Sequence, residues 1–204
     1  TDMRAVMVAG ALAMAACGAD GVLNGVAHAQ QPTQSGPDGA EYCVYMKLTD
    51  TSDYVVVAEG LLAGLDQDKA QAAVKAAGDA CIKEYGMSQN EAASASDVGI
   101  FGSAADYLIE GLADEGVSDD VIDGLYAVID EMSDEDIDMI FDGSWRDDAA
   151  MKARLRAAVV AKGIPDEDRL VQDASLLIEV SALASDAAMN YLMADMDEVE
   201  AEES

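Results

Sequence analysis

The stretch between residues 166 and 195 constrains the fold more than any other part of the chain. Its sequence, DEDRLVQDASLLIEVSALASDAAMNYLMAD, repeats apolar or small residues at steps of three and four, which is the period of an α-helix. The polar side chains form only a narrow strip, made of Gln172, Ser175, Glu179, Asp186 and Asn190. A helix that is apolar over most of its circumference is normally surrounded by other elements. The sequence therefore predicts an all-α protein in which this long C-terminal helix is the most buried element.

The preceding segments also have helical periodicity, and no strand-like alternation runs for more than a few residues. Ser88 and Glu91 have the spacing of a capping box, which marks a helix start. The helix that they open contains Gly99 and Gly102, so we expect close packing of helices there and a break near Gly99. We predict a single compact bundle of about seven or eight helices over residues 40–196, followed by a disordered acidic tail over residues 197–204.

The N-terminal region reads as a targeting segment. Residues 1–29 combine Arg4, an apolar run and an Ala27-His28-Ala29 motif, which is typical of a signal peptide cleaved between Ala29 and Gln30. Residues 30–39 are polar and contain two prolines, which predicts a flexible tether. A second processing site stays open, because Cys17 follows the apolar run directly, as in a bacterial lipoprotein signal. Either route predicts an exported bacterial protein, periplasmic or secreted after simple cleavage, or membrane-anchored through a lipid on Cys17.

The charge is strongly acidic, with 41 acidic residues against 11 lysines and arginines and a net charge of −30. A polyanion is repelled by phosphate backbones and by anionic headgroups, so we expect no nucleic-acid partner. The mature chain has no apolar run long enough to cross a bilayer. The partner that this charge favours is an unknown protein or cationic molecule of the cell envelope.

Cleavage at either processing site leaves Cys43 and Cys81 as the only pair of thiols in the folded domain, because Cys17 is either removed or lipidated. Both lie on apolar faces of their expected helices, and export places them where disulfides persist. The helix expected between them allows the first and third helical elements to pack together. The sequence therefore predicts a Cys43–Cys81 disulfide.

Cleavage after Ala29 also removes His28, the only histidine. Ser-His-Asp and Cys-His nucleophile systems and histidine-based zinc sites then become unavailable, and no phosphate-binding glycine loop is present. We therefore expect no cofactor and assign no catalytic residue. The expected function is a non-catalytic binding or structural role. The alternative is a carboxylate-dependent hydrolase acting on envelope polysaccharide, for which Glu110 and Glu179 are loose candidates because each lies in a largely apolar stretch.

Asp134, Asp136 and Asp138 alternate like the first ligands of a helix–loop–helix calcium site. The sixth and twelfth positions of that pattern are Met139 and Trp145, where calcium loops have glycine and glutamate. We therefore expect no dedicated metal site. Whether the acidic stretch 114–148, with 14 acidic residues, binds divalent cations loosely stays open.

Basic residues concentrate in one region, since six of the 11 lysines and arginines fall within residues 146–169. One interpretation is that they form screened surface pairs with acidic neighbours, which contribute little stability. The other is a dipolar surface that orients a binding partner.

Overall fold

The computed structural model describes residues 39–202, with side chains for residues 39–194. The expected signal peptide, its Ala29–Gln30 cleavage site, Cys17 and residues 30–38 of the tether lie outside the described residues. The α-helices are α2 (Cys43–Asp50), α3 (Tyr54–Ala63), α4 (Gln67–Tyr85), α5 (Gln89–Asp114), α6 (Asp119–Asp130), α7 (Asp134–Phe141), α8 (Ala149–Lys162) and α9 (Asp168–Glu202), with 3₁₀ turns η2 (Ala40–Tyr42) and η3 (Ser144–Arg146). Residues 39–202 contain no strand, so the predicted all-α class is confirmed.

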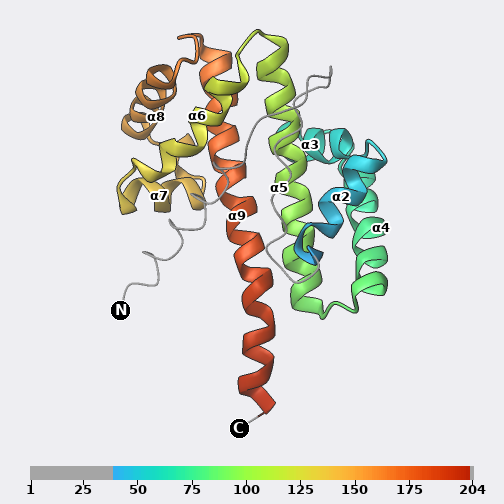
Figure 1. The fold of residues 1–204 in the computed structure, drawn as a ribbon. Helices are drawn as coiled ribbons and strands as arrows, with labels where there is room; N and C mark the ends of the chain where they lie inside the picture. Colours follow the sequence, from blue (N-terminus) through green and yellow to red (C-terminus); the bar gives the residue numbers. More distant parts are fainter. Residues whose placement is uncertain (1–38, 203–204) are drawn as a thin grey trace, which may run out of the picture.

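Helices α5 and α9 form the centre of the bundle and run antiparallel along most of the length of α5 (Figure 1). Helices α2, α3 and α4 pack against α5, and α6, α7 and α8 gather around the first half of α9. The long C-terminal helix is thus the central element that its apolar circumference predicted. The last turns of α9 project beyond the other helices (Figure 1).

The C-terminal end of α9 differs from the sequence-based boundary. The helix continues to Glu202, through the segment after residue 197 where we expected a disordered acidic tail. The sequence DEVEAE contains no glycine or proline to stop the helix, and Glu and Ala are good helix formers. Among residues 39–202, no helix combines the length and the apolar character needed to cross a membrane.

Helix α5 is unbroken at Gly99, contrary to our expectation, and the two glycines instead serve as contact points for α2. A Cβ atom on Gly99 would lie 2.6 Å from Val44 Cγ1, and one on Gly102 would lie 2.7 Å from Tyr45 Cδ2. The Tyr45 hydroxyl also donates a 2.7 Å hydrogen bond to Asp106 on α5. Close packing and this bond outweigh the weak helix propensity of glycine, so the helix continues.

The core has two main parts that meet along α5. The larger part lies among α5, α6, α8 and α9, with Leu112, Leu125, Leu155 and Leu177 fully buried. The smaller part lies among α2, α3, α4 and the first half of α5.

The α5 helix begins at the predicted capping box, in which the Ser88 side chain accepts from the Glu91 backbone N–H and the Glu91 carboxylate accepts from the Ser88 N–H. This cap fixes where the central helix starts.

Candidate functional site

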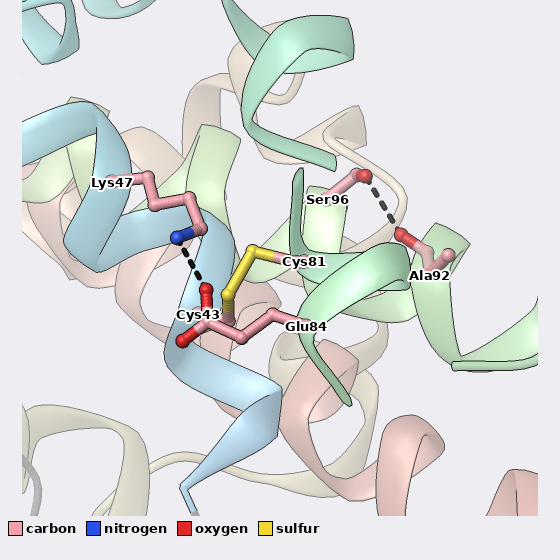
Figure 2. Close-up of a disulfide and its surroundings, with 6 residues drawn as sticks. All are labelled: Cys43, Lys47, Cys81, Glu84, Ala92 and Ser96. Atoms are coloured by element: carbon pink, nitrogen blue, oxygen red, sulfur yellow. Dashed lines mark hydrogen bonds and ion pairs between the residues drawn. A yellow bond between two sulfur atoms is a disulfide. The ribbon is translucent and has the colours of Figure 1, made fainter. Parts of the chain in front are cut away.

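The predicted disulfide joins α2 to α4 in the smaller part of the core. Cys43 and Cys81 are 2% and 0% exposed, their sulfur atoms are bonded at 2.03 Å, and their Cα atoms lie 5.9 Å apart. One turn further along each helix, Lys47 and Glu84 form an ion pair at 2.7 Å, and Figure 2 shows the two links side by side. The short α2 helix is therefore tied to α4 by a covalent bond and by an exposed ion pair.

A second constellation surrounds Glu179, which the sequence placed on the polar strip of α9. The side chain is only 3% exposed, because the 3₁₀ turn η3 covers this part of the helix. The Trp145 indole N–H donates to Glu179 Oε2 at 3.1 Å, and the Arg146 guanidinium contacts the same oxygen at 2.5 Å. Ser175, on the same strip, is 2% exposed and its hydroxyl donates to the Val171 carbonyl oxygen. Two of the five residues of the expected polar strip, Ser175 and Glu179, are thus buried and hydrogen-bonded.

Burial and hydrogen bonding shift the pKa of the Glu179 carboxyl in opposite directions. Burial raises the pKa of Glu179, while the Trp145 hydrogen bond and the Arg146 charge lower it by less, so the pKa ends above its ordinary value. The Arg146 guanidinium carbon lies 5.5 Å from the centroid of the Trp145 ring, which adds a cation–π contact. The three side chains form one charged, hydrogen-bonded unit that connects η3 to the middle of α9.

Arg146 lies between two shallow pockets. The first, of about 320 Å³, is mostly apolar and is lined by Leu61, Leu62, Phe101, Arg146, Glu179, Val180 and Leu183. The second, of about 450 Å³, is lined by Trp145, Arg146, Lys152, Ala153, Arg156, Asp168, Val171, Gln172 and Ser175. The first pocket offers an apolar wall beside an ion pair, and the second offers three cationic side chains.

Neither of these two pockets has the geometry of a glycoside hydrolase, which needs two carboxyl groups facing one cleft. Each pocket is lined by a single acidic residue, Glu179 in the first and Asp168 in the second. The other loose candidate, Glu110, lines neither pocket and instead accepts hydrogen bonds from the Tyr54 hydroxyl at 2.8 and 2.9 Å. This contact, with burial, raises the pKa of Tyr54 to about 12. The structure therefore does not bring the two loose candidates into one pocket.

The three alternating aspartates of the calcium-like pattern lie on helix α7, where residues two apart do not face each other. The Asp136 carboxylate accepts hydrogen bonds from the Arg154 guanidinium at 2.5 and 3.3 Å. The backbone N–H of Asp136 donates to the Ser133 side chain. Across the part of the chain that the structure describes, no three His, Cys, Asp or Glu residues are grouped to hold a metal ion.

The basic residues of 146–169 divide into two groups. Arg154, Lys162 and Arg169 reach acidic residues of other elements, at Asp136, Glu131 and Glu115. These contacts match the interpretation of surface pairs. Arg146, Lys152 and Arg156 line the second pocket, although Arg146 and Arg156 also form ion pairs, with Glu179 and with Asp166 and Asp168. The sequence indicated the concentration of bases but not this convergence, because it depends on how η3, α8 and α9 meet.

Comparison with known proteins adds no relationship: no family model, no curated protein and no solved structure matches the chain.

Proposed function

We propose that this chain is an exported protein, periplasmic or secreted, with a non-catalytic binding role. The buried Cys43–Cys81 disulfide is the main observation that supports a location outside the cytoplasm. Disulfides persist in oxidising compartments and are rare in the reducing cytosol, where such a pair stays as thiols. The signal-like sequence of residues 1–29 supports the same location independently.

The binding role is supported by the distribution of charge. Exposed acidic side chains follow one another along α6 and α7, at Asp119, Asp120, Asp123, Asp130, Glu131, Asp134 and Glu135. Such a surface attracts a cationic protein face and repels nucleic acid. The hydrolase alternative has less support, because neither described pocket joins two carboxylates.

Processing in a bacterial host tests the proposed location. The full chain, expressed with residues 1–29, is fractionated and its intact mass is measured. We expect a mature form that starts at Gln30, recovered outside the cytoplasm with Cys43 and Cys81 oxidised. A lipid-bearing N-terminus at Cys17 would instead establish the anchored form, and an uncleaved cytoplasmic chain with alkylatable thiols would contradict export.

Carbodiimide crosslinking in the intact envelope tests the binding role, because it joins exposed carboxylates to lysines of a bound protein. We expect a crosslinked partner whose yield falls when Asp119, Asp120 and Asp123 are replaced by Asn. Replacing three exposed acids of another surface, Asp66, Asp68 and Asp79, is the matched control. Equal loss of yield in both triple variants would indicate nonspecific attraction to the net charge. Hydrolysis of envelope polysaccharide that is abolished in Glu179→Gln would favour the hydrolase alternative.

A further inference from the structure

The second pocket places three cationic side chains around one opening in a strongly acidic protein. Arg146 comes from η3, Lys152 and Arg156 come from α8, and the start of α9 forms the remaining wall. Three of the chain's 11 basic residues thus line a single pocket of about 450 Å³. The one acidic residue in its lining is Asp168, at the first turn of α9.

The cations of this pocket are only partly neutralised. The Arg156 guanidinium donates to the Asp166 and Asp168 carboxylates at 2.7 and 2.8 Å and to the Asp166 carbonyl oxygen at 3.5 Å, which leaves two of its five N–H groups for a ligand. The Arg146 side chain is 49% exposed although one of its nitrogens contacts Glu179. Lys152 is exposed and forms no ion pair with any residue of the described part of the chain. The pocket therefore retains cationic donors that an incoming anion can use.

We propose that this pocket binds a phosphate group, carried by inorganic phosphate or by a small phosphate monoester. This site is separate from the acidic surface of α6 and α7, so the proposal goes beyond the proposed binding role and does not depend on export. Two guanidinium groups from η3 and α8 and an ammonium group from α8 line the pocket, and phosphate, with several charged oxygens, can accept hydrogen bonds from more than one of them. The pocket is large enough for one such group with a small organic substituent.

The net charge of the chain does not prevent this binding. At physiological ionic strength the screening length is about 8 Å, so acids elsewhere on the surface contribute little to the potential inside the pocket. A long polyanion is different, because it would extend over the acidic surface beyond the pocket. The site therefore favours a single small phosphate group over nucleic acid.

Trp145, the only tryptophan of the chain, lines the pocket and serves as a reporter. The oxidised full chain is titrated with inorganic phosphate and, separately, with glycerol 3-phosphate, at constant ionic strength set by sodium chloride. Intrinsic fluorescence and isothermal calorimetry follow the binding. We expect saturable binding of at least one probe, and tighter binding of glycerol 3-phosphate if the natural ligand is a monoester.

Three variants distinguish specific phosphate binding in this pocket from nonspecific electrostatic attraction of phosphate to the protein. Lys152→Gln removes the uncompensated ammonium and is expected to weaken binding about tenfold or more, the effect of losing a hydrogen bond from a charged donor. Asp168→Asn removes the acid from the pocket lining and is expected to tighten binding. Lys83→Gln, at an exposed lysine on α4 outside this lining, is expected to have no effect.

Melting temperatures by circular dichroism verify that the variants are folded. The absence of saturable heat and fluorescence change with both probes would overturn the proposal, even if the chain proved to be exported. Equal affinities for wild type and the folded Lys152→Gln variant would overturn it as well.

Discussion

Trp145 donates the hydrogen of its indole nitrogen to the carboxylate of Glu179, 34 residues later in the chain, at 3.1 Å. Trp145 is 5% exposed and lies in a 3₁₀ turn of three residues, which has little hydrogen bonding of its own to hold it. The bond therefore anchors the connection between α7 and α8 to the central helix. It also gives the buried carboxylate one of its two donors.

Loss of this donor should destabilise the protein. In Trp145→Phe, the buried Glu179 carboxylate loses a hydrogen bond, and the smaller phenyl ring fills less of the space that the indole occupies. We therefore expect a loss of about 2–4 kcal/mol in the free energy of unfolding. Urea denaturation followed by far-ultraviolet circular dichroism measures it. Tyr85→Phe, at an exposed aromatic residue at the end of α4, is the control and should change stability by less than about 1 kcal/mol. Equal effects in both variants would show that the hydrogen bond contributes nothing.

The raised pKa of Glu179 predicts a pH dependence with a defined sign. A carboxyl whose pKa is higher in the folded than in the unfolded state stabilises the fold at low pH. This stabilisation is fully present below the unfolded-state pKa and is lost as the pH rises through the folded-state pKa. On acidification from pH 7 to about pH 4, close to the unfolded pKa of glutamate, wild type should therefore gain stability relative to Glu179→Gln, which stays neutral. Denaturation of both proteins at several pH values measures the difference. A stability difference that is independent of pH would contradict it.

The disulfide should contribute most of the stability of the α2–α4 contact. Cys43 and Cys81 are separated by 38 residues, and closing a loop of that length stabilises a fold by about 3–4 kcal/mol in the chain-entropy model. The double variant Cys43→Ala/Cys81→Ala should lose about this much free energy of unfolding. Lys47→Ala, which removes only the adjacent exposed ion pair, should cost less than about 1 kcal/mol. Similar losses in both variants would argue against the loop-closure effect.

Two glycines of α5 offer a matched test of the α2–α5 contact. In Gly99→Ala the new Cβ would lie 2.6 Å from Val44 Cγ1, so we expect a destabilisation of about 1–3 kcal/mol. In Gly111→Ala the Cβ would meet nothing within 4 Å, and the better helix propensity of alanine should stabilise the protein by about 0.5–1 kcal/mol. Thermal denaturation distinguishes the two. Stabilisation by both substitutions would mean that α2 does not pack closely at Gly99.

Local sequence patterns were sufficient for the helical elements and for the disulfide. The long helix, the capping box at Ser88 and the all-α class follow from periodicity and capping, which act between residues a few positions apart. The Cys43–Cys81 pairing could also be predicted, because the folded domain holds only this pair of thiols after either cleavage. The acidic composition after residue 197 suggested disorder, whereas α9 continues to Glu202, because glutamate and alanine favour a helix.

The tertiary structure alone decided what surrounds Glu179 and where the basic residues converge. The sequence placed Glu179 on a polar strip, but its burial depends on the turn at Trp145, which lies 34 residues away. The requirement for glycine at position 99 similarly comes from Val44, a contact between distant parts of the chain. Periodicity reports which face of a helix is apolar, but it carries no information on which other element covers a given turn. The meeting of Arg146, Lys152 and Arg156 in one pocket therefore required the packing of η3, α8 and α9.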